Sequence, residues 1–327
     1  MTSSIDIPVL ITAFTRYDTL REVFMAVRKA RPTRIYFACD GPRNEVDRVK
    51  CENVRALVEL VDWNCEINTL FHENNLGCKA AMVANLDWFF SNEEEGIILE
   101  DDVVPDATFF PFCQVLLQRY RHDPHVWAIV GNNLSAPLEL TTSDSYWTSS
   151  HGLGAYWGWA SWRRVWKQFD VDMKMWPTVR GTPMFRNWFL SDVERREVYM
   201  LFEKTYSGKI RTAWDYQFDF AKILAGSVNI IPEANLCRNI GFGADGTHTV
   251  KVSDSRNSGV LQSARFPLIH PRSLEIDPVR DLAYFTKHVL PSRFNRVKAW
   301  VKRRLPDTVK ESVTPLVRSI ERKLRLG

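Results

Sequence analysis

Several signatures of familiar protein classes are missing from this chain of 327 residues. Its six cysteines are scattered, and no two have the CxxC spacing of a zinc or redox site. No apolar run is long enough to cross a bilayer, and the first residues show neither the basic nor the apolar part of a secretory signal. We therefore expect a cytoplasmic chain with reduced thiols.

Two glycine patterns that hold phosphates are also missing. The absence of GxGxxG argues against a dinucleotide oxidoreductase, and the absence of GxxxxGK[ST] argues against a P-loop NTPase. There is no internal repeat and no low-complexity segment. A phosphate-bearing ligand would therefore be held by side chains and a metal ion rather than by a glycine-rich loop.

Positive charge is concentrated at one end of the chain. The net charge is +4, but residues 286–327 contain twelve Lys or Arg and three Asp or Glu, a net +9, so the remaining body carries 4 − 9 = −5. Apolar residues recur in this tail at about helical spacing, with Pro306 and Pro315 as breaks. We expect a basic helical tail. It either contacts anionic lipid or extends into solvent, and nucleic acid is not an expected partner.

Strand and helix patterns alternate over about the first 134 residues, which predicts an α/β fold. Runs of apolar residues with strand length end in polar turns, and amphipathic stretches separate them. This alternation predicts a doubly wound parallel sheet with right-handed crossovers. The predicted strands are 7–14, 34–39, 65–71, 96–99 and 126–130, and the predicted helices are 18–31 (with Asp18 as N-cap), 44–61, 79–90 and 106–121.

Beyond residue 134 the alternation stops. Residues 135–150 have the composition of a loop, and residues 151–166 form a segment rich in Gly and Trp that leads into a helix. Trp214 and Asp215 open another amphipathic helix, and residues 228–231 form a short strand.

Three consecutive acids, Glu100, Asp101 and Asp102, follow the predicted strand 96–99. Carboxylates this close repel one another unless a cation or hydrogen-bond donors lie among them. Mg²⁺ and Mn²⁺ prefer such oxygen ligands, and open α/β sheets bind ligands at the carboxyl ends of their strands. A solvated acidic turn is the alternative.

Other polar residues follow the earlier strands and should lie at the same edge of the sheet. An Asp after a strand can bind a base or a ribose, or it can form an Asp-Gly turn. Glycine and lysine at the next strand end can approach a nucleotide or can begin a helix. These candidate ligand-binding residues are Thr12, Arg16, Asp40, Asn75, Gly77 and Lys79.

Together these motifs resemble the GT-A glycosyltransferases, in particular the N-acetylglucosaminyltransferase I type and a set of bacterial sugar transferases. The resemblance covers about residues 7–250 and is most specific at the three acids and at Trp214-Asp215. It implies a GT-A-like, mostly parallel, doubly wound sheet. It also implies a domain over 1–285, with a nucleotide-binding half (about 1–134) and an acceptor half (about 135–285), followed by the tail 286–327.

The resemblance implies a role for each acid. Asp102 would hold the Mn²⁺ or Mg²⁺ that bridges the donor diphosphate, Asp101 would face the ribose, and Glu100 would face the donor sugar. Asp40 would contact the uracil. Asp215 would act as the base on the acceptor hydroxyl, and the alternative for Asp215 is a structural N-cap beside a buried Trp.

Two further segments are similar to parts of that family. Trp157 and Gly158 correspond to a glycine-rich segment near the donor sugar, although the tryptophans here also suit a protein core. His248 lies in a segment that resembles a loop closing over the nucleotide. It would contact the diphosphate or complete the metal shell, and a loop histidine with neither role is the alternative.

The resemblance and the acid centre together predict an inverting, metal-dependent glycosyltransferase. It would move a sugar from a nucleotide-sugar donor, expected to be a UDP-sugar, to a hydroxyl of a glycan or lipid-linked glycan. Bacterial polysaccharide biosynthesis at the inner face of the membrane fits this activity. One alternative is a sugar-nucleotide-forming nucleotidyltransferase, which needs a glycine-rich N-terminal loop that residues 10–16 lack. The other is a non-catalytic carbohydrate-binding module that uses the tryptophans.

Overall fold

The computed structural model describes residues 5–133, 143–150, 156–241, 260–286 and 290. The chain divides into two compact units, Met1–His288 and Val289–Gly327. Nearly all of the basic tail lies outside the described residues, so its helical character stays a prediction. The following description concerns the first unit.

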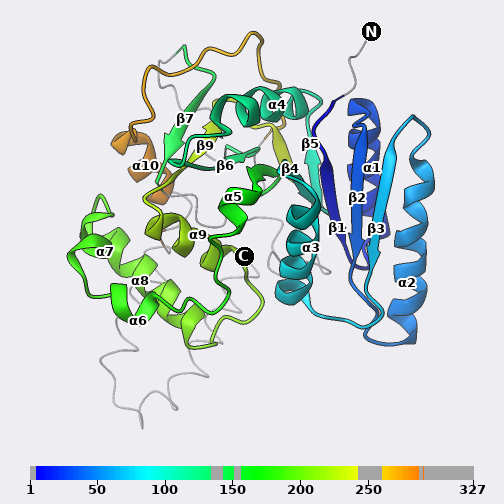
Figure 1. The fold of residues 1–327 in the computed structure, drawn as a ribbon, viewed down its shortest axis with the longest axis horizontal. Helices are drawn as coiled ribbons and strands as arrows, with labels where there is room; N and C mark the ends of the chain where they lie inside the picture. Colours follow the sequence, from blue (N-terminus) through cyan, green and yellow to red (C-terminus); the bar gives the residue numbers. More distant parts are fainter. Residues whose placement is uncertain (1–4, 134–142, 151–155, 242–259, 287–289, 291–327) are drawn as a thin grey trace, which may run out of the picture. The chain divides into compact units, whose positions relative to one another are not determined.

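An eight-stranded mixed sheet forms the centre of the fold (Figure 1). Its strand order is β3-β2-β1-β4-β8-β6-β9-β7. The α/β class and the mostly parallel sheet predicted from the sequence are therefore confirmed. The strands are β1 (Val9–Ala13), β2 (Arg34–Cys39), β3 (Glu66–Phe71), β4 (Glu95–Glu100), β6 (Val126–Val130), β7 (Tyr146–Ser149), β8 (Trp159–Trp162) and β9 (Val228–Pro232).

The first four strands of the sheet, β3, β2, β1 and β4, are parallel and close to their predicted bounds. They are connected by α1 (Tyr17–Ala30), α2 (Glu45–Ala56) and α3 (Cys78–Asn92). Helices cover both faces, because Phe37 of β2 packs against Phe24 of α1, while its neighbour Tyr36 packs against Phe89 of α3. The prediction of Asp18 as the N-cap of α1 is wrong, since Arg16 occupies that position and Asp18 lies in the first turn.

The other half of the sheet contains antiparallel strands that the sequence pattern did not predict. β8 lies between β4 and β6 and is antiparallel to both, and β7 pairs antiparallel with β9. Each has only four residues and is buried along its whole length, so neither shows an alternation of apolar and polar residues. The short strands β5 (Val103–Pro105) and β10 (Cys237–Asn239) form a separate antiparallel pair beside the acid centre.

A second hydrophobic core lies under a group of helices in residues 173–224. Trp176 is at its centre, with ring contacts to Phe185, Phe202 and Phe220. Phe220 belongs to α9, and Phe218 of the same helix lies in the main core against the sheet. α9 therefore joins this group of helices to the sheet. The helices are α6 (Trp176–Val179), α7 (Pro183–Asn187), α8 (Asp192–Tyr206) and α9 (Asp215–Leu224).

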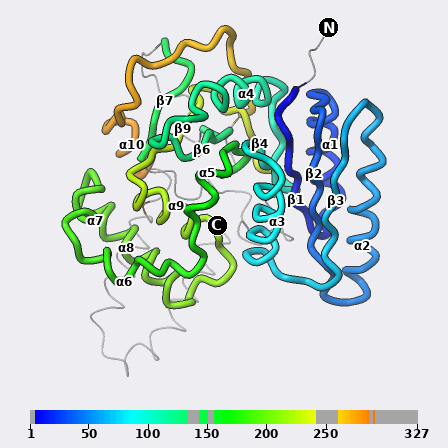
Figure 2. Tube along the Cα trace, in the orientation of Figure 1, coloured from blue at the N-terminus to red at the C-terminus, as the bar shows by residue number. Residues whose placement is uncertain are grey.

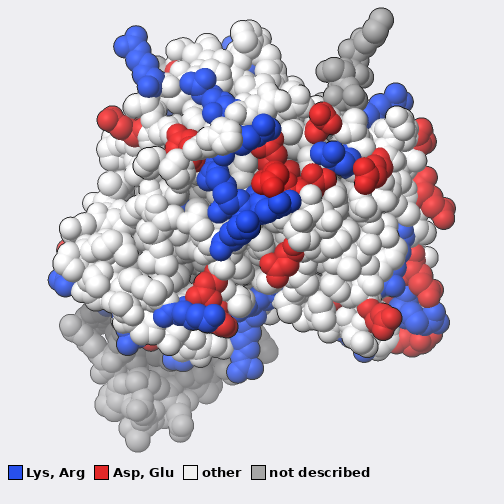
Figure 3. All heavy atoms as spheres, in the orientation of Figure 1, with Lys and Arg blue, Asp and Glu red and all other residues white. Residues whose placement is uncertain are grey.

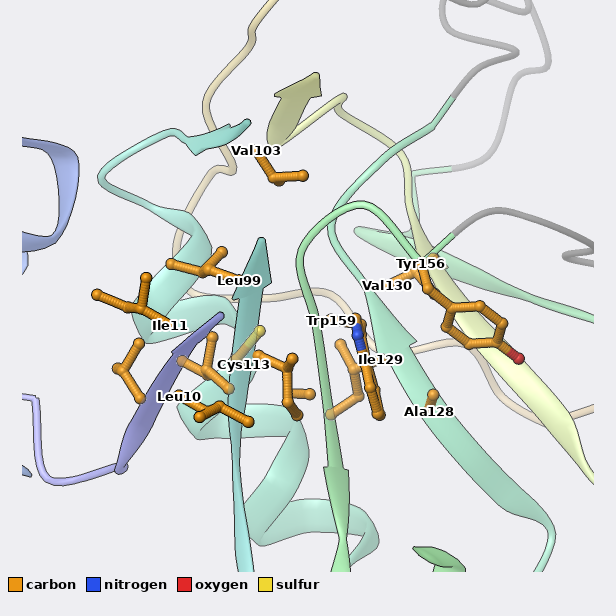
Figure 4. Close-up of a cluster of buried hydrophobic side chains, with 14 of the residues drawn as sticks. Leu10, Ile11, Leu99, Val103, Cys113, Ala128, Ile129, Val130, Tyr156 and Trp159 are labelled. Carbon is orange, nitrogen blue, oxygen red and sulfur yellow. The ribbon is translucent and has the colours of Figure 1, made fainter. Parts of the chain in front are cut away.

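Most tryptophans belong to the main core rather than to a surface. Figure 4 shows Trp159 among buried side chains from β1, β4 and β6. Trp159 stacks on Trp214 with ring centroids 5.6 Å apart, and Trp162 and Trp166 are also buried. The short α5 (Arg163–Trp166) continues from β8. α4 (Phe109–Tyr120) covers the other face of the sheet, and its Leu117 carbonyl accepts a hydrogen bond from the indole N–H of Trp162.

The colour gradient in Figure 2 shows that the first hundred residues form one side of the sheet and later residues the other. The short α10 (Pro278–Tyr284) packs on this later part, where Asp281 accepts hydrogen bonds from Ser150. On the face in Figure 3, acidic and basic side chains lie in small mixed groups. No helix among the described residues combines the length and apolar character needed to cross a membrane.

Candidate functional site

The three acids lie where β4 ends, as predicted, and Arg16 lies among them. The Arg16 guanidinium pairs with the Asp101 carboxylate, and its Nη1 donates to Asp102 Oδ2 at 2.8 Å. The backbone N–H of Phe14 also donates to Asp101, at 3.4 Å. Since Arg16 follows β1 and the acids follow the neighbouring β4, the parallel pairing of these strands is what brings them together.

The acid centre has more negative charge than Arg16 can neutralise. Burial raises the pKa of Glu100 to about 8, and the charges of Asp102 and Asp101 add to this rise. Burial also raises the pKa of Asp101 to about 6, although Arg16 opposes that shift. Burial alone would lower the pKa of Arg16, but the two aspartates outweigh it and the net shift is upward. The site therefore favours additional positive charge.

The segment after β10 closes over Asp102. Asn239 Nδ2 donates to Asp102 Oδ1 at 3.2 Å, and the backbone N–H of Ile240 donates to the Asp102 carbonyl at 2.8 Å. Gly241 approaches so closely that an added Cβ would lie 2.0 Å from Asp102 Oδ2 and 2.7 Å from Arg16 Nη1. Only glycine fits there without displacing the Arg16–Asp102 pair.

Asp40 organises the turn that precedes α3. Its Oδ1 accepts the backbone N–H groups of Gly41 and Leu76 at 2.8 and 2.9 Å. Its Oδ2 accepts Asn75 Nδ2 and the Gly77 N–H at 2.9 and 3.1 Å. These four bonds favour the structural alternative for Asp40, an Asp-Gly turn that also holds the 75–77 segment in place.

A pocket of about 720 Å³ opens above these residues. It extends from the ends of β1 and β2 to the acid centre and reaches the start of α3. Seven of the residues predicted from the sequence line it: Thr12, Arg16, Asp40, Asn75, Gly77, Glu100 and Asp101. Asp102 is not among the lining residues, and Arg16 and Asn239 both donate hydrogen bonds to it.

Asp215 is the first residue of α9, and it is electrostatically coupled to the acid centre. Burial raises the pKa of Asp215 to about 7, and the charge of Asp219, one turn later in α9, adds to the rise. The Asp215 charge in turn raises the pKa of Glu100. Burial raises the pKa of Cys78, at the start of α3 in the pocket wall, and the charges of Glu100 and Asp215 add to this rise. The charges of Asp215 and Glu100 therefore both act on one pocket residue, Cys78.

The remaining predicted residues have other surroundings. With the Gln217 amide turned so that its oxygen faces Lys79, Lys79 Nζ donates to that oxygen at 2.7 Å and joins the start of α3 to the first turn of α9. Gly158 has φ +65° and packs against Cys237, whose Sγ would lie 2.5 Å from an added Cβ. Trp157 is half-buried against the main core. None of the three lines the pocket, and His248 lies outside the described residues.

Sequence reasoning missed several pocket residues. Arg43, Lys50 and Cys78 line the pocket. Ile240 and Gly241 also line it, but they belong to the segment through His248 that resembles a loop closing over the nucleotide. Arg43 follows Asp40 closely in the sequence and Cys78 directly follows Gly77, so their closeness to predicted site residues was a usable signal. Lys50 lies within α2, and no local motif marks it.

Carboxylate oxygens, the donors that Mg²⁺ and Mn²⁺ prefer, are concentrated at this end of β4. Two of the three carboxylates, those of Asp101 and Asp102, share the Arg16 guanidinium, and burial together with neighbouring carboxylate charge raises the pKa values of Glu100 and Asp101. Within the described ranges, no group of three or more Asp, Glu, His or Cys side chains is arranged so that it could hold a metal ion by itself. A site with one or two carboxylates, completed by ligand phosphates, is the usual arrangement for Mg²⁺.

No protein-family model and no curated protein matches the sequence. Among solved structures, the chain is similar to the mannosyltransferase PcManGT from Pyrobaculum calidifontis in complex with GDP-Man and Mn²⁺. That match has 12% identity and a TM-score of 0.40, and it covers 69% of this chain and 73% of that chain. The inositol-1-phosphate CTP transferase from T. maritima has 12% identity and a TM-score of 0.32, covering 74% and 92%. HddC from Yersinia pseudotuberculosis has 8% identity and a TM-score of 0.31, covering 52% and 85%. Similarity at this level does not single out the N-acetylglucosaminyltransferase I type, nor does it indicate a reaction.

Proposed function

We propose that this chain is an inverting, metal-dependent glycosyltransferase that uses a nucleotide-sugar donor, a UDP-sugar in the first instance. The observation that carries the proposal is the buried acid centre at the end of β4, where Arg16 pairs with Asp101 and Asp102 beside a pocket of about 720 Å³. A donor diphosphate beside the acid centre and an acceptor hydroxyl beside Asp215 would then lie on opposite sides of the transferred sugar. The acceptor class, a glycan or a lipid-linked glycan, comes from the resemblance alone.

The residues of this site suit the two requirements of glycosyl transfer. Asp102 would hold a divalent cation together with the donor diphosphate, and that cation would stabilise the charge that develops on the leaving diphosphate. Asp215 would accept the proton of the acceptor hydroxyl as the hydroxyl oxygen attacks the anomeric carbon. Its raised pKa, about 7, is near the operating pH at which a general base is most effective.

Titration calorimetry with UDP and Mn²⁺ tests this proposal directly. We expect the wild-type protein to bind UDP in a manner that depends on Mn²⁺, and we expect Asp102→Ala to lose that dependence. UDP should be released from UDP-sugars only by transfer of the sugar to an acceptor or to water. Asp215→Asn should bind the donor but lose turnover. Wild-type protein that binds UDP no better than Asp102→Ala does would refute the metal-dependent transferase.

A nucleotidyltransferase is the second candidate, and one observation favours it. Arg43 and Lys50 line the pocket in addition to Arg16, and three cations suit a nucleoside triphosphate. Incubation with a sugar 1-phosphate and UTP would then release pyrophosphate. The carbohydrate-binding alternative is weakened, because Trp159, Trp162 and Trp214 are buried in the core instead of forming a surface.

A further inference from the structure

An ion pair is buried in the protein core one helical turn after Asp215. Asp219 and Lys222, both in α9, are 0% and 1% exposed, and Lys222 Nζ donates to Asp219 Oδ1 at 3.0 Å. Moving two charges out of water is costly, and a buried ion pair is often no more stabilising than two apolar side chains of similar size. Residues that only held α9 against the sheet would therefore not need to be charged.

Tyr156 connects this ion pair to the sheet. Its hydroxyl donates to Asp219 Oδ1 at 2.7 Å and accepts a hydrogen bond from Asn229 Nδ2 of β9 at 3.4 Å. Its ring lies beside that of Trp159, with centroids 5.6 Å apart (Figure 4), and 5.8 Å from the ring of Trp214. Asp219 therefore accepts hydrogen bonds from a buried ammonium group and a buried hydroxyl, and both donors favour its ionised form.

The helical repeat places the Asp219 charge close to Asp215. Residues four apart are neighbours on one side of an α-helix, about 6 Å apart along its axis, whereas Lys222 is seven residues away, about 10.5 Å. The negative member of the pair is thus the nearer one. Burial is the main cause that raises the pKa of Asp215 to about 7, and the Asp219 charge adds to the rise. Burial likewise raises the pKa of Tyr156, with contributions from the charges of Asp219 and Asp215.

The other charged and titratable groups that face Asp215 belong to β4 and α3. The Asp215 charge adds to the rise in pKa that burial causes in Glu100, at the end of β4, and in Cys78, at the start of α3. Lys79 is bonded to the first turn of α9. Glu100 and Cys78 line the pocket, where a bound ligand would change their surroundings, whereas Asp219 is enclosed in the core. The fold itself therefore fixes the effect of Asp219 on Asp215.

We propose that Asp219, Lys222 and Tyr156 position Asp215 and strengthen it as a proton acceptor; this inference rests on the function proposed above. The bonds from Asp219 through Tyr156 to the sheet hold the first turns of α9, and with them the Asp215 carboxylate. A negative charge one turn away favours a proton on Asp215, and a more basic carboxylate accepts a proton from a hydroxyl more readily. All three residues are enclosed in the core, so they act on the reaction only through Asp215.

Two double variants remove both charges and leave neither one unpaired. Asp219→Asn/Lys222→Met keeps an oxygen that can accept the Tyr156 hydroxyl, and Asp219→Leu/Lys222→Leu makes the site apolar. Replacing both members of a buried ion pair is often neutral for stability. The matched control is Glu233→Gln/Arg280→Met. It removes the ion pair of another enclosed cation, since Arg280 is 3% exposed and lies beside the edge strand β7.

The first measurement is the pH dependence of kcat with a UDP-sugar that the wild-type protein turns over. In both double variants we expect the acidic limb to move down by about one pH unit, because a charge about 6 Å from the base is lost. At the pH optimum kcat should fall at least about threefold, because the base is weaker, while KM stays within about twofold. The control variant should keep the wild-type limb.

The second measurement needs no turnover. Asp215→Asn is introduced into the wild-type protein and into both double variants, and its gain in the free energy of unfolding is measured in urea at pH 8. A folded-state pKa raised above the unfolded value means that the ionised carboxylate destabilises the fold at this pH, and asparagine removes that cost. Without the Asp219 charge the cost is smaller, so the gain should be roughly one third smaller in the double variants.

An acidic limb that stays at its wild-type pH in a folded double variant would overturn the inference, and so would an undiminished gain from Asp215→Asn. Loss of folding in both double variants would also overturn it, because the charges would then serve the fold. These results leave wild-type turnover, and with it the proposed function, intact. A wild-type protein that turns over no UDP-sugar would instead refute the proposed function, and Asp215 would have no proton to accept.

Discussion

Asp215→Asn should stabilise the protein at neutral and alkaline pH while it abolishes turnover. The ordinary pKa of an aspartate is 3.8, and in this site burial, together with the charge of Asp219, raises the pKa of Asp215 to about 7. Each pKa unit corresponds to about 1.4 kcal/mol, so three units give about 4 kcal/mol. Because part of the side chain reaches solvent, we expect about 2–4 kcal/mol.

The sign follows from proton binding. Between about pH 4 and 7 the folded protein retains a proton on Asp215 that the unfolded chain has released, so the free energy of unfolding falls as the pH rises through this window. An asparagine has no proton to lose and avoids this penalty. The gain from the substitution should therefore be close to zero below pH 4, intermediate at pH 5 and complete above pH 7.

Urea unfolding of both proteins at pH 5 and pH 8 measures this gain. Asp192→Asn is the matched control, since Asp192 is also the first residue of a helix, but its side chain is 87% exposed. It should change stability little at either pH. A gain for Asp215→Asn that is absent at pH 8, or equal at the two pH values, would refute the burial argument, and retained turnover would refute the role of Asp215 as base.

Three further results are expected. Turnover of wild-type protein should decline below about pH 7, as Asp215 becomes protonated, and a pH–rate profile with no acidic limb near 7 would contradict this. Gly241→Ala should weaken UDP binding at least about tenfold without unfolding the protein, because its Cβ would displace the Arg16–Asp102 pair. Gly181→Ala is the control and should leave UDP binding unchanged, because the space around Gly181 is open. Asp40→Asn should lower the free energy of unfolding by about 1–3 kcal/mol, measured in urea, because an amide oxygen replaces a carboxylate that accepts four N–H bonds.

The parallel half of the fold could be predicted because its sequence pattern is local. β1, β2 and β4 each contain a continuous apolar run that ends in a polar turn. Between these strands, apolar residues recur at the spacing of a helix. β7 and β8 are four-residue strands with no polar alternation, and their pairing with β9, β4 and β6 is decided by contacts distant in sequence. Such strands leave little trace in a window of neighbouring residues.

The acid centre was predictable in composition but not in its contacts. Three adjacent carboxylates after a buried strand indicate a ligand site from chemistry alone. Nothing in the sequence around Arg16 indicates that its guanidinium lies between Asp101 and Asp102, 85 and 86 residues later. The close approach of Gly241 depends likewise on the pairing of β10 with β5.

The position of Asp215 depends on β8, which explains how this proposed base can lie near acids that belong to the other half of the sheet. Trp159 of β8 pairs with Ile98, two residues before Glu100, and its ring stacks on Trp214. The Trp159–Trp214 contact therefore fixes the start of α9 relative to the end of β4. Lys79 adds a second link between the start of α3 and the first turn of α9. Because both links lie beside the pocket rather than in its wall, they can set the spacing between Asp215 and Glu100 without occupying the space that a sugar needs.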